Sequence, residues 1–442
     1  MSRYYLDLEE STMKTILLPY GKTKLELNLP EERLAGILES HAHDFKPEKS
    51  ESELVRDALM NPIDSPRLKE LVVGKKNIVM IASDHTRPVP SKVILPEIMK
   101  EIESGNPDAT LTILIATGFH RLTTRDELID KFGEDMVDHP KIRYVIHDST
   151  NDEDMAYLGI LPSGGKLIIN KLAVEADLLI SEGFIEPHFF AGFSGGRKSV
   201  LPGISSRTTV LANHCSKFIA DPHSRAGSLD ENPMHKDMLW AAETAKLQFI
   251  CNVLLDADKK VIAAYAGHLN NAHRKGCEFM NQLAGVKAIH SDIVITTNGG
   301  YPLDQNIYQS VKGMTAAEAC CNEGGVIIIA TSCSDGHGGE SFYRTFLDEP
   351  DNQKIMDQFL ATDAEHTIPD QWESQILCRM LLKFKVIFVT DAPEQMIRDM
   401  HMDYAHNLDE AIAMADEYLG KKDSKITVIP DGIAVIVNPS DK

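Results

Sequence analysis

Short runs of apolar residues alternate with helical patterns along the whole chain, and this alternation restricts the fold more than any other feature. Each run is too short for a helix and is typical of a parallel strand that is buried on both faces. The runs span residues 77–82, 111–116, 142–146, 178–181, 292–297, 325–330 and 386–390. Strands that alternate with helices predict an α/β fold with mainly parallel sheets.

The length of 442 residues exceeds what one hydrophobic core usually fills, so two α/β domains are expected. A ribbon over 249–266 and a polar helix from 271 to about 283 mark the join. We therefore expect an N-terminal cofactor-binding domain over 1–275, which opens with a hairpin over 14–29, and a C-terminal domain over 286–423. The closing runs 426–429 and 433–437 predict a second hairpin.

The composition excludes several classes of protein. A net charge of -21 argues against nucleic acid or an anionic membrane as partner, because both require a basic surface. No apolar stretch approaches 18 residues, and the first residues lack the order of a secretion signal, so a cytoplasmic location is expected. The seven cysteines form no C-x-x-C pair, and neither disulfides nor a zinc knuckle follow.

The stretch 186–203 combines a histidine, a glycine-rich turn and a basic pair. Glycines permit positive φ and a close backbone approach to a ligand, and free N–H groups in such turns bind anions. The three glycines are Gly192, Gly195 and Gly196. The spacing nearly matches the nucleoside-triphosphate loop, but Arg197 occupies a position that this motif requires as glycine. A phosphate-bearing cofactor is therefore expected, not hydrolysed ATP; the alternative is a surface turn with a solvated basic pair.

Polar residues follow the predicted strands where each strand ends. Asp84, Arg87, His120 and His188 all occupy such positions. Because ligands of open parallel sheets bind beyond the carboxyl ends of strands, these residues are expected to meet at one edge of one sheet. Histidine suits proton transfer near neutral pH. Each residue alone has an alternative interpretation as a capped or solvated loop residue.

The predicted helix over 306–319 carries three further candidates. Tyr308 and Lys312 lie four positions apart and share a helix face, with Gln309 at its edge. The alternative is an ordinary solvated face.

Several motifs in one order resemble the nickel-dependent lactate racemase family, the nickel-pincer nucleotide 2-hydroxyacid racemases. They run through almost the whole chain and lie at 83–90, 116–121, 186–203, 213–214, 299–312 and 371–372. Together they are more specific than any one motif alone.

The resemblance implies a cofactor and a metal. Lys198 matches the residue that carries, in thioamide linkage, pyridinium-3-thioamide-5-thiocarboxylic acid mononucleotide, which binds nickel as a pincer. His214 matches the histidine that completes the square plane of the metal, and a nitrogen donor suits Ni(II). The implied cofactor-binding residues are Lys198, Asp84, Gly192, Ser194, Gly195, Gly196 and Arg197. Maturation proteins that install the cofactor are implied partners.

The resemblance also implies the reaction, which interconverts the D and L enantiomers of a small 2-hydroxy acid, with lactate as the expected substrate. Hydride leaves C2 for the cofactor while a base removes the hydroxyl proton, giving a bound keto acid. The two bases match His120 and His188. The implied substrate-binding residues are Arg87, Tyr308, Gln309, Lys312 and Trp372. The active site is expected in the cleft between the domains, and the tail 424–442 is expected to return to the first domain.

Three alternatives stay open. The same cofactor could serve a racemase or epimerase of another 2-hydroxy acid. A nicotinamide dehydrogenase would share the hydride chemistry, but no early G-x-G-x-x-G turn is present. A non-catalytic nucleotide-binding protein would use the glycine loop and leave His120, His188 and Lys312 without a role.

Overall fold

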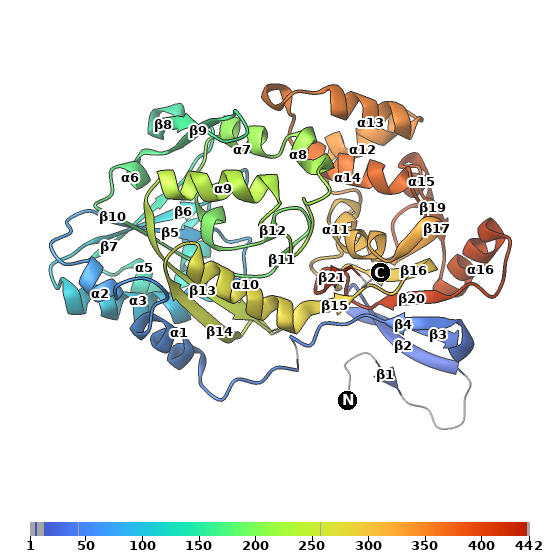
Figure 1. The fold of residues 1–442 in the computed structure, drawn as a ribbon, viewed down its shortest axis with the longest axis horizontal. Coiled ribbons are helices and arrows are strands. Elements are labelled where there is room, and N and C mark those ends of the chain that lie inside the picture. The colour runs from blue at the N-terminus through green and yellow to red at the C-terminus, as the bar shows by residue number, and fades with distance from the viewer. Residues whose placement is uncertain (1–4, 7–12, 43, 257, 440–442) are drawn as a thin grey trace. The chain divides into compact units, whose positions relative to one another are not determined.

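The computed structural model describes residues 5–6, 13–42, 44–256 and 258–439. They form two compact units, which Figure 1 colours along the chain. The middle unit is His41–Leu283, and the terminal unit combines Met1–Ser40 with Ala284–Lys442. No helix among the described residues is both long and apolar enough to cross a bilayer.

The middle unit is built on a six-stranded sheet of order β14-β13-β10-β5-β6-β7. All neighbours are parallel except β13 and β14, which form the antiparallel ribbon predicted from the sequence. The strands are β5 (Ile78–Ser83), β6 (Leu111–Ala116), β7 (Ile142–Ile146), β10 (Leu178–Phe184), β13 (Leu247–Leu255) and β14 (Val261–Gly267). Each apolar run of the first half of the chain thus forms a strand; β5, β6 and β10 are mostly buried, whereas β7 at the edge of the sheet is only partly buried.

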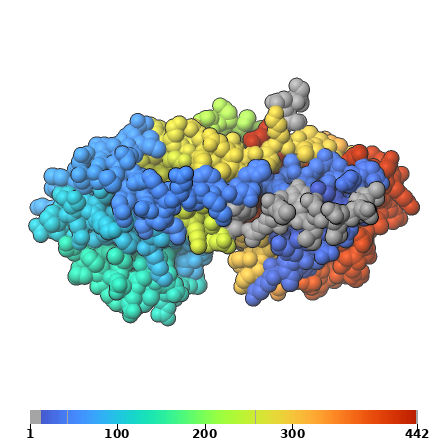
Figure 2. Space-filling view, turned by 90° about the horizontal axis from the view of Figure 1, so that it is seen from below, coloured from blue at the N-terminus to red at the C-terminus, as the bar shows by residue number. Residues whose placement is uncertain are grey.

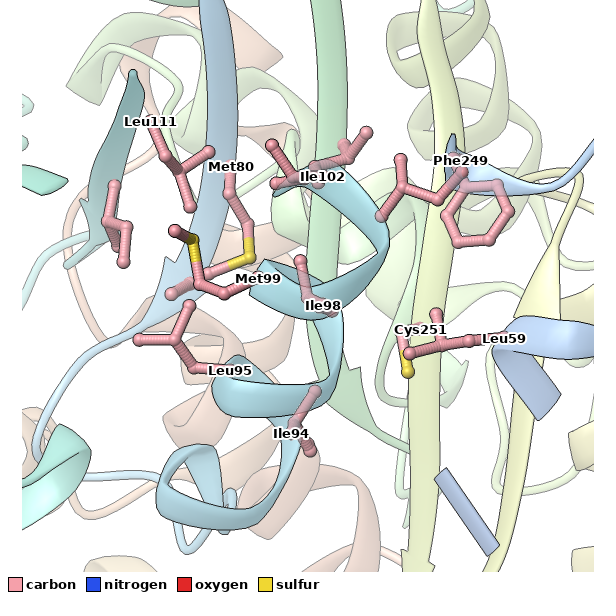
Figure 3. Close-up of a cluster of buried hydrophobic side chains, with 14 of the residues drawn as sticks. Leu59, Met80, Ile94, Leu95, Ile98, Met99, Ile102, Leu111, Phe249 and Cys251 are labelled. Atoms are coloured by element: carbon pink, nitrogen blue, oxygen red, sulfur yellow. The ribbon is translucent and has the colours of Figure 1, made fainter. Parts of the chain in front are cut away.

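Helices α1 (Glu51–Met60), α2 (Leu68–Leu71) and α3 (Ser91–Gly105) contribute to the hydrophobic core on one face of this sheet. Figure 3 shows Ile94, Leu95, Ile98 and Ile102 of α3 beside strand residues that include Met80. The spacing of these α3 residues gives the apolar stripe of a helix that packs on a sheet. Burial of this stripe fixes α3, and with it the loop after β5 that leads into the helix.

The remaining elements of the middle unit include those that carry the glycine-rich stretch. They are α4 (Arg125–Phe132), α5 (Glu134–Val137), η2 (Asp152–Asp154), β8 (Met155–Ile160), β9 (Lys166–Asn170), α6 (Lys171–Val174), β11 (Pro187–His188), β12 (Gly192–Phe193), η3 (Gly196–Ser199), α7 (Arg207–Asn213), α8 (Ser216–Ala220), α9 (Pro233–Thr244) and α10 (Asn271–Ala284). The short helix η3 contacts β5, β10 and α9. A capping box of Thr124 and Glu127 opens α4.

The terminal unit is built on a second six-stranded sheet, of order β19-β18-β17-β16-β20-β4, in which every pair is parallel. Its strands are β4 (Leu34–Ile37), β16 (Ser291–Thr297), β17 (Cys321–Ala330), β18 (Lys385–Val389), β19 (Asp403–Ala405) and β20 (Ile426–Ile429). Its helices are η1 (Glu31–Arg33), α11 (Ile307–Glu318), α12 (Glu340–Leu347), α13 (Asn352–Ala361), η4 (Ala364–His366), α14 (Gln371–Leu381), α15 (Glu394–Asp399) and α16 (Leu408–Leu419).

One face of this second sheet is covered by α16 and by the N-terminal hairpin. The hairpin consists of β2 (Met13–Tyr20) and β3 (Thr23–Pro30), with β1 (Tyr5–Leu6) beside β2. Ile16, Leu18, Leu27 and Leu29 bury their side chains against the sheet. Figure 2 shows this blue segment next to orange and red residues from the C-terminal part of the chain. Helix α11 packs against β16 and β17.

The end of the chain differs from its prediction. Strand β20 does not form a hairpin with the next run; it lies between β16 and β4, parallel to both. The following strand β21 (Ile436–Asn438) pairs with β15 (Gly285–Lys287) instead. All four residues of β20 are buried, as a central parallel strand requires, whereas a hairpin usually keeps one solvated face. Both the opening hairpin and the tail therefore belong with the C-terminal sheet, not with a domain of residues 1–275.

Candidate active site

The ends of the neighbouring strands β5 and β6 bring Asp84 and His120 together. The Nδ1 atom of His120 lies 2.6 Å from Oδ2 of Asp84. Asp84 is 1% exposed, whereas the His120 side chain is 39% exposed. A buried carboxylate that accepts the Nδ1 proton leaves the lone pair on Nε2. His120 is thereby held in the tautomer that a general base requires.

A short chain of hydrogen bonds continues from Asp84 to Arg87. The Thr86 hydroxyl donates to Oδ1 of Asp84 at 2.7 Å, and Nη1 of Arg87 donates to that hydroxyl at 2.8 Å. Burial by itself raises the pKa of Asp84, but the hydrogen bonds from His120 and Thr86 and the charges of His120 and Arg87 outweigh it and lower the pKa. Asp84 is therefore a carboxylate at neutral pH. The resemblance had implied a cofactor contact for Asp84, whereas here the carboxylate contacts His120.

The glycine-rich stretch follows β10 and has the backbone that the sequence predicted. Gly192, Gly195 and Gly196 have φ values of 79°, 75° and 53°. An added Cβ would lie 2.1 Å from the Ser228 carbonyl oxygen at Gly192 and 2.7 Å from the Phe184 carbonyl oxygen at Gly195. Glycine is thus required here by close approach to protein atoms.

Arg197 and Ser194 both turn into the loop. The Arg197 guanidinium donates to the carbonyl oxygens of Ala191 at 2.7 Å and Phe193 at 2.8 Å, and the residue is 1% exposed. Burial lowers the pKa of Arg197 to about 10. The Ser194 hydroxyl donates to the Phe184 carbonyl oxygen at 2.9 Å. These two side chains hold the loop in shape.

Phe190 brings three predicted site residues together. Its ring centroid lies 4.6 Å from that of His188 and 5.3 Å from that of His214, in edge contacts with both. The Nζ atom of Lys198 lies 5.9 Å from the same ring. Phe190 is 4% exposed, so its ring is a fixed apolar surface that the two imidazoles and the lysine contact. No role for Phe190 was predicted, although its position two residues after His188 in the stretch 186–203 could have indicated a place in the site.

The backbone selects the tautomer of each imidazole beside Phe190. His214 Nδ1 lies 3.1 Å from the Val210 carbonyl oxygen and so carries a proton, which leaves the lone pair on Nε2. His188 Nδ1 instead accepts from the Ala191 N–H at 3.3 Å. Burial, followed by the charge of Lys198, lowers the pKa of His214 to about 3. A neutral, buried imidazole of this kind is the form that binds transition metals.

The terminal unit holds the other candidates on α11 and α14. The Tyr308 hydroxyl donates to Oδ1 of Asp370 at 2.9 Å and accepts from the Trp372 side chain. The Lys312 Nζ donates to Oε1 of Gln309 at 2.6 Å. The structure therefore brings all four predicted residues of this unit into one cluster between the two helices. Asp370, at the start of α14, has a φ of 66°, a backbone strain of the kind found at functional sites.

A further histidine, His235, lies on α9 and is 2% exposed. Burial and the nearby charge of Arg197 lower its pKa to about 3. His223, in contrast, is exposed. Within the described ranges no three His, Cys, Asp or Glu side chains gather as a metal site.

An α/β fold with a histidine on a buried carboxylate, and a lysine next to a buried imidazole of lowered pKa, has the features of an enzyme site. The family model of the lactate racemase N-terminal domain matches residues 20–227, and the family model of the lactate racemase C-terminal domain matches residues 286–437. The chain belongs to the lactate racemase family.

Individual relatives agree with this assignment. The chain is 58% identical to the lactate racemase of Thermoanaerobacterium thermosaccharolyticum, over 96% of this chain and 99% of that protein. It is 54% identical to the lactate racemase of Lactiplantibacillus plantarum, over 96% of this chain and 100% of that protein. The solved apoprotein of the Thermoanaerobacterium enzyme has a TM-score of 0.92 at 57% identity, over 96% of this chain and 100% of that one. A Thermotoga maritima structure shares the fold alone, at 20% identity and a TM-score of 0.61.

Proposed function

We propose that the chain is a lactate racemase that works with a nickel-pincer nucleotide attached to Lys198. The observation that carries this proposal is the grouping of Lys198, His188 and His214 around Phe190. An anchor for a cofactor, a metal ligand and a base thus share one apolar support. His120 on Asp84 supplies the second base. The identity to two lactate racemases supports lactate as substrate.

The residues present fit this cofactor. His214 offers a neutral imidazole whose proton lies on Nδ1, so Nε2 can bind nickel. Nickel needs further donors, and the sulfur, carbon and sulfur atoms of a pincer on Lys198 would provide them. The tight loop held by Arg197 fixes the backbone that carries Lys198. When bound, the cofactor supplies an electrophile that takes the C2 hydrogen of the substrate as hydride and returns it.

The two histidines move the hydroxyl proton. His120 Nε2 removes it on one face, and Asp84 stabilises the imidazolium that forms. His188 serves the opposite face in the same way. In this structure Nδ1 of His188 accepts the Ala191 N–H at 3.3 Å, so the neutral ring carries its proton on Nε2; His188 must give up this hydrogen bond or change tautomer before it accepts the hydroxyl proton. The two faces are thus served by bases with different supports.

Arg87 and Lys312 are the cations that this proposal assigns to the substrate carboxylate. Arg87 presents a planar fork suited to a carboxylate, and Lys312 adds a point charge. Gln309 positions the Lys312 ammonium, to which it is hydrogen-bonded. Tyr308 and Trp372 form a hydrogen-bonded aromatic pair that suits the small methyl group of lactate. The same proposal includes a cytoplasmic location and loading by maturation proteins.

The first test measures composition and activity on protein from a host that makes the cofactor. We expect nickel near one per chain, a covalent mass addition on the Lys198 peptide, and racemisation of both lactate enantiomers. If nickel and the adduct are present but the protein racemises only another 2-hydroxy acid, lactate is the wrong substrate and the class of enzyme still holds. Active protein that contains neither nickel nor the adduct would overturn the proposed cofactor. A requirement for a nicotinamide cofactor would favour a dehydrogenase.

The second test separates the two bases in a single turnover. Because the enantiomers have equal free energy, any variant must have the same kcat/KM in both directions, so steady-state rates cannot distinguish the histidines. We expect His120→Ala to form keto acid from one enantiomer only and His188→Ala from the other only. If both variants react with the same enantiomer, the two-base assignment is wrong.

A further inference from the structure

A buried carboxyl of the terminal unit has no role in the function proposed so far. Glu373 is the third residue of α14, directly after Trp372, and it is 0% exposed. Neither of its side-chain oxygens has a hydrogen-bond partner among the described residues. A buried charge without hydrogen bonds is costly, so such a group must take a proton or pair with a cation.

The groups that face Glu373 come from α11 and from the start of its own helix. Lys312 of α11 attracts its carboxylate, and Asp370 repels it. The Tyr308 phenol also faces this carboxyl and is hydrogen-bonded to Asp370. Helix α12, which packs against α14, turns Phe342 to the Tyr308 ring at 5.3 Å.

We propose that Glu373 is the resident counter-ion of Lys312, and that a substrate carboxylate displaces it, so that substrate binding is coupled to uptake of one proton by Glu373. In the ligand-free chain, when Glu373 is ionised, the Lys312 ammonium is the cation that compensates the buried carboxylate. When the ammonium turns to the substrate anion, Glu373 loses this compensation. It then binds a proton from solvent, and the charge of the cluster is conserved.

The electrostatics of the cluster set the pH range of this exchange. Burial raises the pKa of Glu373 to about 8, although Lys312 lowers it from the value that burial alone would give. Below this value Glu373 is already neutral, and Lys312 is available to the substrate. Above it, the ionised Glu373 competes for Lys312, so the affinity for lactate must fall as the pH rises. A coupling of one proton corresponds to about tenfold in Kd per pH unit.

This inference rests on the proposed function, because it assigns Lys312 to the carboxylate of lactate. Its test uses the full-length chain and calorimetric lactate binding at pH 6.5 and pH 9 in buffers of different ionisation enthalpy. The wild type is expected to take up nearly one proton at pH 9 and almost none at pH 6.5. Glu373→Gln is expected to take up none at either pH and to keep the same Kd at both. Proton uptake by Glu373→Gln equal to that of the wild type would overturn the inference.

Two further variants control for structure. Glu318→Gln changes another carboxyl between the same helices, since Glu318 of α11 accepts from Arg379 of α14 at 2.9 and 2.7 Å. It is expected to keep the proton uptake of the wild type. Glu373→Met fills the same volume without a charge, and it replaces Glu373→Gln as the test variant if the amide fails to fold. A loss of uptake in Glu318→Gln as large as in Glu373→Gln would mean that helix packing, not the counter-ion, is responsible.

A ligand-free arm separates this inference from the proposed function. The carboxyl carbon of labelled Glu373 is titrated by nuclear magnetic resonance in the wild type and in Lys312→Gln, without lactate. Removal of Lys312 is expected to raise the titration midpoint, because the attractive charge is lost. An unchanged midpoint overturns the inference whether or not lactate binds. A raised midpoint together with no lactate binding supports the counter-ion pair and refutes lactate as the substrate.

Discussion

Replacing Asp84 with asparagine tests whether the carboxylate fixes the state of His120. The contact of 2.6 Å joins a carboxylate to an imidazole nitrogen. A hydrogen bond to a charged group contributes about 1.5–3 kcal/mol, which corresponds to about 10- to 100-fold in rate. An asparagine amide could also donate to Nδ1 and move the proton to Nε2, the tautomer that cannot act as a base. The same change in a Ser-His-Asp triad costs about 10⁴-fold in kcat. We therefore expect kcat/KM to fall by about 10²- to 10⁴-fold.

The assay follows racemisation from each enantiomer by chiral chromatography, with cofactor content matched by mass spectrometry. Both directions must slow equally. Thr86→Val is the matched control, because it removes one hydrogen bond to Asp84 and keeps the carboxylate; a fall of less than about tenfold is expected. Asp84→Asn with a kcat/KM within threefold of the wild type, at equal cofactor content, would refute the role of Asp84.

Three further predictions concern the loop and the metal ligand. Lys198→Ala is expected to lose the covalent adduct and all activity while its thermal unfolding stays within a few degrees of the wild type. His214→Ala is expected to keep the adduct but lose most nickel, whereas the exposed His223→Ala keeps both; unchanged nickel in His214→Ala would move the ligand elsewhere. Gly195→Ala is expected to lower the free energy of unfolding by about 2–4 kcal/mol, because it adds close contacts to a positive φ. Gly164→Ala has a positive φ with open space and should cost only about 1–2 kcal/mol in urea denaturation.

The strands and the residues at their ends could be predicted from the sequence. An apolar run such as 111–116 has few alternatives to a buried strand, and parallel strands place their carboxyl ends at one edge. The contact between Asp84 and His120, 36 positions apart in the chain, follows from that geometry. The sequence thus identified both residues as members of one site before any distance was known.

The direction of side chains inside the loop could not be predicted. Arg197 next to Lys198 in a glycine-rich stretch suggests a cation for an anionic ligand. The turn, however, leaves carbonyl oxygens at Ala191 and Phe193 that need donors, and the guanidinium satisfies them. Which group a long side chain reaches depends on the folded backbone, and residue type alone does not determine it. The roles of Asp370 and Glu373 were missed for the same reason.

The end of the chain was predicted incorrectly because an apolar run fits two structures. Residues 426–429 could form either one arm of a hairpin or a central strand with both faces covered. Only the partners decide between them, and those partners are β16 and β4. Strand β4 lies nearly 400 positions earlier in the chain, so no local pattern could identify this pairing.

The pairing of β4 with β20 also sets an order for folding during synthesis. The middle unit is one continuous segment, His41–Leu283, and all its strands are synthesised before β16. The terminal sheet, in contrast, needs a strand from each end of the chain, so β4 must wait for nearly the whole protein to be translated. Domains generally fold as units as they emerge. The half that carries Lys198 and His214 is thus free to fold first, and the half that carries Lys312 can close its sheet only after β20 has been made.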